Sequence, residues 1–421
     1  MKFFQKRIYY GWIIVVAAFL CLTFTYGLRY AFGVFFTPMC EEFGWTRTTT
    51  SGVFSLYMIF YAVGAPITGR MVDKYGPKIL MISGACLLGL GMLGCSIISK
   101  IWQLYLFYGV LVGLGSAAAG WICATTTISK WFIKKRGIAT GIASAGIGLG
   151  SAIFAPLVAL LITSFDWRTS YAICGVLIWA VSIPLASLMV KSPEDKGLCP
   201  DGISEYEKIK VAPAKELPWE ARDALKTSSY RAIFLTHLLM AFQLQMVMVH
   251  LVPYAIDVGI DRIVAAGSLG LLGLISIVGR IGGGWLSDRI GRKATLAASM
   301  AIQGICLLFL PKIIASKALY IFVVVYGISY GGWAPLFAPL TADIFGRASL
   351  GTLWGIITIA SGIGGAIGPL FAGWFYDTLA SYSQAFIIGG IISIIASILF
   401  VLLVKLIKNP VKVGLENKIQ D

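Results

Sequence analysis

The stretch "ISIVGRIGGGWLSDRIGRK", residues 275–293, joins a long apolar segment to a short charged loop. Its final part, "GWLSDRIGRK", has a counterpart much earlier in the chain, "GRMVDKYGPK" at residues 69–78. Both read G-x-x-x-D-basic-x-G-x-basic, and their aspartates, Asp73 and Asp288, are 215 positions apart. One such loop could be an ordinary turn between helices, but two copies at matching places predict an internal repeat.

A second pair of segments repeats at nearly the same offset. "GIASAGIGLGSAIFAPL" at 141–157 is similar to "GIITIASGIGGAIGPL" at 355–370. The two repeats predict an N-terminal half (1–189) and a C-terminal half (231–421), joined by a cytoplasmic linker (190–230). Repeated halves with a binding site at their interface are a common design of secondary transporters.

The composition requires a lipid environment. Of 421 residues, 58% are hydrophobic and only 13% are charged, which is more apolar surface than a soluble protein can bury. The net charge of +15 is spread over short loops between apolar runs, with no basic domain, so we expect no nucleic-acid partner. The eight cysteines form no CxxC pair or Cys/His cluster, so the sequence predicts no metal site, disulfide scaffold or cofactor.

A bilayer core requires about 20 apolar residues per helix. By that rule the chain has twelve transmembrane helices and is an all-α membrane protein, because backbone polar groups in lipid must be satisfied within each helix. The expected spans are 12–37, 49–69, 79–98, 102–128, 138–163, 168–189, 231–257, 264–286, 294–311, 317–341, 351–374 and 383–405. The apolar run after the basic N-terminus is too long for a signal-peptide core and is expected to be a retained first span.

The basic residues predict the orientation. Of the 34 Lys and Arg residues, 26 would lie on the side of the N-terminus and six in the opposite loops. Basic residues are enriched on the cytoplasmic side, so both termini are predicted to be cytoplasmic. The linker mixes acids and bases, which favours a solvated tether with at most one amphipathic helix on the membrane surface.

The repeated loops are predicted to form a cytoplasmic gate. Their glycines allow a tight turn and close helix approach, and each aspartate can pair with basic residues or cap a helix. Such a cluster would latch the cytoplasmic side and break when the halves rock. The gate residues are Gly69, Asp73, Lys74 and Gly76 in the first copy and Gly284, Asp288, Arg289, Gly291 and Arg292 in the second.

With these loops, the chain resembles the major facilitator superfamily over nearly its whole length. Twelve helices in two pseudo-symmetric six-helix halves is the fold that this resemblance implies. The similarity narrows to the monocarboxylate transporter family, bacterial type, through "WFIKKRGIATGIASAG" at 131–146, "YYGWIIVVAAF" with "GVFFTPMCEEFGW" in the first span, and "HLVPYAIDVGI" followed by "SIVGRIGGGWLSDRIGR". Bacterial oxalate/formate exchangers share several of these motifs.

Arg280 is the strongest candidate for substrate binding. It lies within the eighth span, where an ionisable residue costs about 2.5–3.5 kcal/mol or more. Gly273, Ser276 and Gly284 share its helix face and would leave space beside a guanidinium that can hold a carboxylate bidentately. The alternatives are a structural ion pair or snorkelling toward the cytoplasm. The resemblance implies the substrate role, because Arg280 matches the family's carboxylate-binding arginine.

Proton coupling is assigned to the seventh span. Gln243, His250 and Asp257 are seven residues apart and share one face, and a carboxylate and an imidazole on such a stripe can carry a proton. The alternatives are that Asp257 caps a helix end and that His250 only packs. Mammalian family members carry an acid one turn before the arginine, where this chain has Ser276, so any proton coupling requires another group.

Arg29 has three open interpretations: a second carboxylate binder, a gate partner for Asp257, or a snorkelling side chain near the outer surface. Alignment through "GVFF" places Tyr30, not Arg29, on the lysine of mammalian members. The tenth span carries Tyr326, Tyr330, Trp333 and Phe337 at helical spacing. Trp121, Tyr26, Tyr30 and Trp354 could add to a cavity wall. Such stripes are more often packing, but Tyr330 could donate its hydroxyl to a carboxylate.

The sequence therefore predicts a transporter of short monocarboxylates such as lactate or pyruvate, with proton symport, acting as a monomer in a prokaryotic plasma membrane. An oxalate/formate-type exchanger is the nearest alternative. Such exchangers use a second cation in span eleven, which has no Lys or Arg here, unless Arg29 replaces it. A drug-efflux pump is disfavoured because a buried arginine is an unusual residue to line the cavity of such a pump. An enzyme is disfavoured because the chain lacks HExxH, GxSxG and His/Cys clusters.

Overall fold

The computed structural model describes residues 9–132, 135–202, 221–345 and 350–404, and this part of the chain is helical throughout its regular structure. It contains 12 helical segments that are long and apolar enough to cross a membrane. The predicted fold class, an all-α membrane protein with twelve spans, is confirmed.

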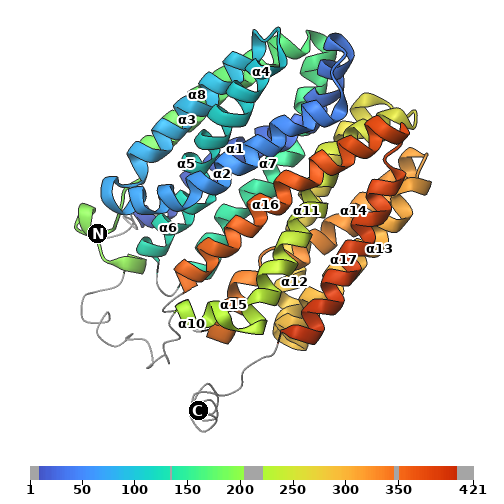
Figure 1. Cartoon of the computed structure of the whole chain (residues 1–421). Coiled ribbons are helices and arrows are strands. Elements are labelled where there is room, and N and C mark those ends of the chain that lie inside the picture. The colour runs from blue at the N-terminus through green and yellow to red at the C-terminus, as the bar shows by residue number, and fades with distance from the viewer. Residues whose placement is uncertain (1–8, 133–134, 203–220, 346–349, 405–421) are drawn as a thin grey trace, which may run out of the picture.

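Six spans form the first half of the molecule (Figure 1). They are α1 (Tyr10–Phe43), α2 (Arg47–Tyr75), α3 (Pro77–Ser96), a composite fourth span, α7 (Arg136–Ser164) and α8 (Trp167–Ser187). The composite span consists of α4 (Ile101–Leu104), the π-helix η1 (Tyr105–Val112), α5 (Gly113–Ala119) and α6 (Trp121–Trp131).

The second half repeats this arrangement. Its spans are α11 (Ser228–Asp257), α12 (Arg262–Ile290), α13 (Arg292–Phe309) with η4 (Leu310–Lys312), α14 (Ser316–Trp333) with α15 (Phe337–Phe345), α16 (Leu350–Leu379) and α17 (Ser383–Leu403). Of the predicted linker, residues 203–220 lie outside the described residues. Its described parts hold η2 (Glu194–Lys196), η3 (Pro200–Gly202) and α10 (Ala221–Lys226).

Polar residues define where several spans begin. The side chains of Thr46, Asp166, Thr227 and Asp261 accept hydrogen bonds from backbone N–H groups in the first turns of α2, α8, α11 and α12. Those N–H groups have no partner within the helix, so each cap fixes a start. At Asp166, hydrogen bonds from the backbone and side chain of Thr169 hold the pKa of the carboxyl below its usual range.

We call the end of the bundle that holds Tyr10 and Leu403 the proximal end, and the opposite end, where α1 ends and α17 begins, the distal end (Figure 1). The halves meet along three pairs of helices: α2 with α16, α7 with α12, and α1 with α11. These pairs line the interface in which a repeat-built transporter would hold its ligand.

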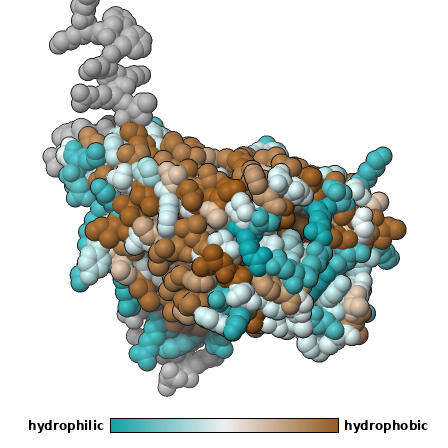
Figure 2. Space-filling model, turned by 90° about the horizontal axis from the view of Figure 1, so that it is seen from above, coloured by the Kyte–Doolittle hydropathy of each residue, from teal (hydrophilic) through white to brown (hydrophobic). Residues whose placement is uncertain are grey.

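Much of the visible outer surface is apolar. Hydrophobic residues cover much of the face shown in Figure 2. Large side chains such as Ile281, Ile321 and Leu402 are 72%, 67% and 66% exposed. A water-soluble monomer rarely exposes large contiguous apolar surface, so this apolar surface is suited to contact with lipid.

Candidate functional site

Arg280 lies on α12, roughly 6 Å past the middle of that helix at 1.5 Å per residue. Its Nη2 donates to the Tyr330 hydroxyl at 3.3 Å, and its Cζ is 5.4 Å from the centroid of the Tyr330 ring. Its Nε is buried and has no hydrogen-bond partner. Among the described residues no carboxylate forms an ion pair with Arg280. The guanidinium therefore has free donors for an anion.

Close contact between α12 and α14 sets this geometry. A Cβ on Gly331 would lie 2.1 Å from the Ser276 carbonyl oxygen and 2.6 Å from the backbone nitrogen of Arg280, so only glycine fits there. This approach brings Tyr330, the preceding residue, beside Arg280.

The expectation that small neighbours leave space around Arg280 is only partly right. The Ser276 hydroxyl donates to the carbonyl of Gly273 at 2.7 Å, and Ser276 packs against α14. A Cβ on Gly273 would collide with Ser151 of α7. These two small residues therefore admit neighbouring helices rather than a ligand. Gly284 differs, because a Cβ there would meet no atom within 4 Å.

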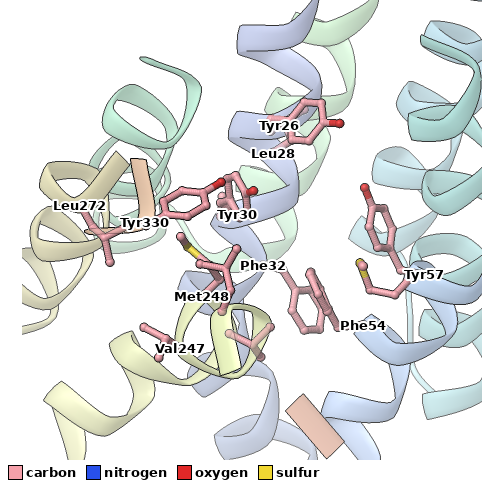
Figure 3. Packing of buried hydrophobic residues seen from close by; sticks show 14 of the residues in the cluster. Tyr26, Leu28, Tyr30, Phe32, Phe54, Tyr57, Val247, Met248, Leu272 and Tyr330 are labelled. Carbon is pink, nitrogen blue, oxygen red and sulfur yellow. The ribbon is translucent and has the colours of Figure 1, made fainter. Parts of the chain in front are cut away.

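The other half of the protein contributes Tyr30 to this position. Its side chain points from α1 toward Tyr330, and the two hydroxyl groups face each other across the interface (Figure 3). Both tyrosines are buried, with 5% and 7% of their surface exposed. The structure thus brings together Arg280, Tyr330 and Tyr30, one arginine and two hydroxyls drawn from both halves.

The fourth and tenth spans are broken at corresponding places. Gly120 has an extended backbone conformation between α5 and α6, and a turn at 334–336 separates α14 from α15. The two breaks are about 214 residues apart, as in the sequence repeats, and interrupted spans at matching positions are a pointer to a transporter's binding site. Tyr330 lies one turn before the second break. Trp121 follows the first, partly buried, with no hydrogen bond or ring contact to Arg280 or Tyr330.

Arg29 is a second cation inside the membrane span. It is only 5% exposed, and its Nη2 donates to the Met58 sulfur at 3.0 Å. Its Cζ lies between 5.2 and 6.0 Å from the ring centroids of five aromatic side chains, Tyr26, Tyr30, Phe54, Tyr57 and Tyr61. This burial excludes the snorkelling interpretation.

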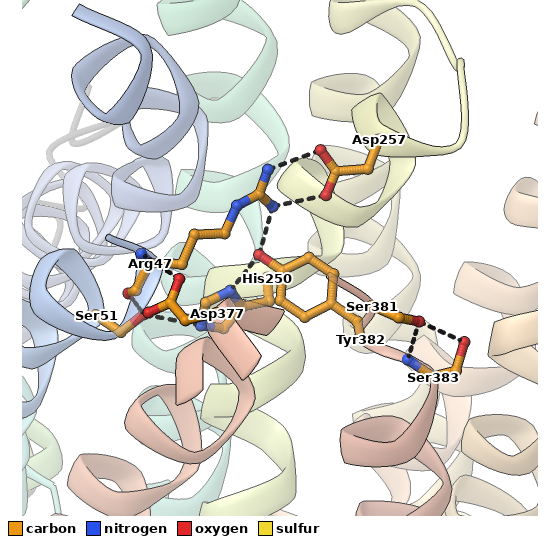
Figure 4. A network of polar contacts seen from close by, with 8 residues as sticks. All are labelled: Arg47, Ser51, His250, Asp257, Asp377, Ser381, Tyr382 and Ser383. Carbon is orange, nitrogen blue, oxygen red and sulfur yellow. Dashed lines mark hydrogen bonds and ion pairs between the residues drawn. The ribbon is translucent and has the colours of Figure 1, made fainter. Parts of the chain in front are cut away.

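Asp257 has a different partner from the one considered in the sequence. Arg47, the first residue of α2, holds both Asp257 oxygens at 2.7 Å through Nη1 and Nη2 (Figure 4). Arg29 is therefore not the gate partner of Asp257. Arg47 lies 3.7 Å over the Tyr376 ring, and the Asp377 carboxylate accepts from the Arg47 backbone N–H at 2.9 Å. The cluster joins α2 of the first half to α11 and α16 of the second.

His250 takes part in the same cluster, so it does more than pack. Its Nε2 is 2.9 Å from the Pro369 carbonyl oxygen, which can only accept, so Nε2 carries the proton. Nδ1 then accepts from the Tyr382 hydroxyl at 3.0 Å, and that hydroxyl accepts from Arg47 at 2.6 Å. A continuous hydrogen-bonded chain at the distal end therefore consists of Arg47, Tyr382 and His250. We call these three residues and Asp257 the distal gate.

Close contacts between the halves run from the middle of α2 and α16 to this end. A Cβ on Gly362 of α16 would lie 2.2 Å from Ala62 of α2, and one on Gly373 would lie 2.8 Å from the Arg47 carbonyl oxygen. Gly284 and Gly355, nearer the proximal ends of α12 and α16, would meet no atom within 4 Å. The structure is closed at the distal end and more open at the proximal end.

The repeated loops adopt matching turns at the proximal end. Gly76 and Gly291 have φ angles of 82° and 88°, a region that favours glycine, and each immediately precedes the next helix. The predicted latch is not formed among the described residues: Asp288 is exposed without an ion pair, whereas Arg292 pairs with Asp343. The Asp73 side chain lies outside the described residues.

The other two basic gate residues contact aromatic rings. Arg289 lies 4.0 Å over the ring of Trp285, and Lys74 lies 5.0 Å from that of Tyr75. Gly69 lies in the last turns of α2, where a Cβ would be 3.8 Å from Ile122. The described charged side chains of the motif therefore contact separate partners rather than one another.

Most of the aromatic stripe of the tenth span is structural. Tyr326 donates to Gln243 at 2.7 Å, Trp333 donates to Gln303 at 2.6 Å, and the two glutamines bond to each other at 2.9 Å. These side chains are buried within the second half. Gln243 therefore belongs to this cluster and not to the hydrogen-bonded chain of His250.

An apolar groove lies on the outer face of the second half. It is lined only by hydrophobic side chains, including Ile305, Phe309 and Phe322, and offers no donor for an anion. Within the described residues, no group of three or more His, Cys, Asp or Glu side chains could hold a metal ion.

Comparison with known proteins places this geometry in a family. The profile of the Major Facilitator Superfamily matches residues 18–311 and 273–419. Monocarboxylate transporter 12 of Mus musculus is 30% identical, covering 95% of this chain and 87% of its own length. The Xenopus laevis protein of the same name is 28% identical over 95% and 91%, and monocarboxylate transporter 2 of Homo sapiens is 29% identical over 92% and 84%.

Solved structures agree on the fold. A bacterial homolog of the human lysosomal transporter Spinster, in an inward-facing and unoccupied conformation, superposes with a TM-score of 0.76 at 16% identity, covering 95% of this chain and 98% of that one. Its occupied form gives 0.72 at 17% identity. The chain is therefore a transporter and not an enzyme, and it belongs to the major facilitator superfamily and, within it, to the monocarboxylate transporter family.

Proposed function

We propose that this protein transports short monocarboxylates such as lactate or pyruvate, with the substrate carboxylate bound to Arg280 and Tyr330. The observation that carries the proposal is the Arg280 guanidinium, which lies within a span, has a buried Nε without a partner, and pairs with no carboxylate of the described residues. A guanidinium remains charged when buried, so it attracts an anion. The names of the relatives support this substrate class.

The Tyr330 hydroxyl and Arg280 would act on the same substrate group. Arg280 can offer two parallel N–H donors to a carboxylate, and the Tyr330 hydroxyl can add a third. Tyr30, from the other half, faces this pair and would contact the bound substrate when the halves close. Trp121 and Ser276 remain weaker candidates, since neither donates to this position in the present conformation.

We further propose that a proton accompanies the anion and that Asp257 receives it. The Asp257 carboxylate holds Arg47 across the distal end of the interface. Protonation would remove its charge and weaken that bidentate pair, which would allow the distal ends to part. His250 would hold Arg47 in place when Asp257 is protonated, because its Nδ1 accepts from the Tyr382 hydroxyl that also binds Arg47.

Symport also fits the electrostatics of the membrane. Moving one uncompensated anion against the membrane potential costs about 2.3 kcal/mol per 100 mV. An anion and a proton together move no net charge. The internal duplication supplies both halves of the interface within one chain, so we propose a monomer, and we place it in a prokaryotic plasma membrane with both termini in the cytoplasm.

The test is uptake of radiolabelled lactate by the purified protein in liposomes, with pyruvate, acetate, formate and oxalate as competitors. We expect lactate uptake that increases when the outside is more acidic. Asp257→Asn should abolish this acid stimulation, whereas Glu41→Gln, which removes an exposed ion pair with Arg262 at the same end, should preserve it. Oxalate exchange without lactate uptake would refute the proposal. Acid stimulation in the Asp257 variant would place the proton site elsewhere.

A further inference from the structure

Two arginines of the described chain share an unusual property. The Nε atoms of Arg29 and Arg280 are both buried and without a hydrogen-bond partner. By contrast, Arg47, Arg168 and Arg262 each pair with an aspartate or glutamate. The two unpaired arginines lie within spans of opposite halves, on α1 and α12.

Aromatic rings explain only part of the environment of Arg29. Five ring faces attract a cation and replace some of the lost hydration. They accept no in-plane hydrogen bonds from a guanidinium. The side-chain acceptors that Arg29 meets among the described residues are the Met58 sulfur, which is a weak acceptor, and the neutral Tyr57 hydroxyl. A buried cation with such weak acceptors is stabilised best by an anion that is not part of the protein, such as a bound ligand.

The environments of the two arginines are continuous. Tyr30 contributes a ring to the cage around Arg29, at 5.5 Å from its Cζ. The Tyr30 hydroxyl in turn faces that of Tyr330, to which Arg280 donates (Figure 3). A line of contacts therefore runs from Arg29 through Tyr30 and Tyr330 to Arg280, and it crosses from one half to the other.

We propose that Arg29 is a second anion-binding position, which takes the distal carboxylate of a short dicarboxylate whose first carboxylate is held by Arg280. This inference rests on the proposed role of Arg280. It extends the substrate class from monocarboxylates to dicarboxylates of two to four carbons. A substrate of this kind would bind one cation in each half and so link the halves through two charges, whereas a short monocarboxylate on Arg280 would meet only the neutral Tyr30 hydroxyl of the first half.

The test measures binding to the purified full-length protein in detergent, by ligand-induced thermal stabilisation at constant ionic strength. Acetate is compared with oxalate, malonate and succinate, a series in which the distance between carboxylates increases. We expect at least one dicarboxylate to bind about tenfold more tightly than acetate, because it gains a second charge-assisted contact. If none of them is preferred over acetate by the wild-type protein, the inference is wrong.

Variants separate the two arginines. Arg29→Gln should remove the preference for the dicarboxylate and leave acetate affinity within about twofold. Arg29→Lys, which keeps the charge and guards against a folding defect, should retain part of the preference because it loses the planar fork. Arg168→Gln, which removes an arginine paired with Glu42 at the surface, is the matched control and should change neither affinity.

Arg280→Gln tests the underlying function independently. It should weaken acetate and dicarboxylates alike. If acetate binding survives in Arg280→Gln, the proposed substrate site fails whatever Arg29 does. If acetate binding requires Arg280 but the dicarboxylate preference persists in Arg29→Gln, the proposed substrate site stands and the second anion position is refuted.

Discussion

Replacing Asp257 with asparagine should open the distal gate. Asparagine keeps the shape of the side chain but removes the charge that holds both terminal nitrogens of Arg47 at 2.7 Å. The backbone contacts of Arg47 and Thr48 with Asp377 remain in the variant. The substitution therefore changes one interaction between the halves without removing the structure around it.

The size of the effect follows from the geometry. The side chains of Arg47 and Asp257 are 13% and 25% exposed, so the pair is partly shielded from water. A hydrogen bond to a charged group contributes about 1.5–3 kcal/mol, and loss of one such contact would shift the equilibrium toward a distally open state by about 10- to 150-fold. The Arg262–Glu41 pair spans the same end, but its side chains are 46% and 54% exposed. Such a surface pair contributes about 0.2–1 kcal/mol, a shift of at most about fivefold.

The assay measures how fast a thiol in the closed contact is modified. Ser55 is 4% exposed and its hydroxyl donates to the Ala366 carbonyl of the other half, so Ser55→Cys reports separation of the halves. A membrane-impermeant maleimide is added from the distal side to protein lacking its eight native cysteines. Asp257→Asn should increase the rate by about 10- to 150-fold and Glu41→Gln by less than about fivefold. Equal rates in the two variants would refute this account of the distal gate.

Two further predictions concern the surroundings of Arg280. Gly331→Ala should destabilise the protein by about 1–3 kcal/mol, because its Cβ would lie 2.1 Å from the Ser276 carbonyl oxygen. Gly284→Ala, with no atom within 4 Å, is the control in thermal unfolding, and similar melting temperatures would contradict the packing argument. Tyr330→Phe should raise the KM for lactate about 3- to 10-fold by removing one hydroxyl donor near Arg280. An unchanged KM would show that this hydroxyl does not reach the substrate.

The repeats and the apolar pattern made the fold predictable from the sequence. Two glycines at equivalent places in the repeated loops, Gly76 and Gly291, both adopt positive φ angles before a helix, as a shared turn requires. Helix ends were less predictable. The first span was expected at 12–37 but runs from Tyr10 to Phe43, because a helix can continue beyond the hydrocarbon core without more apolar residues.

Arg280 could be identified because a lone charge in an apolar span is exceptional. Arg47 could not, since an arginine at the start of a span is an ordinary loop residue and its partner Asp257 is 210 positions away. The break at Gly120 gave no signal either, because the glycine lies in the run "GSAAAGW" of small residues that also occurs in continuous helices.

The most direct test of the central claim is equilibrium binding of radiolabelled lactate to purified wild-type protein and to Arg280→Ala, with Arg168→Gln as control. If Arg280 holds the carboxylate, its removal should weaken binding by at least about thirtyfold, which corresponds to ~2 kcal/mol for the loss of a charge-assisted pair. The control should bind as the wild type does. Unchanged lactate affinity in a folded Arg280→Ala protein would contradict the account.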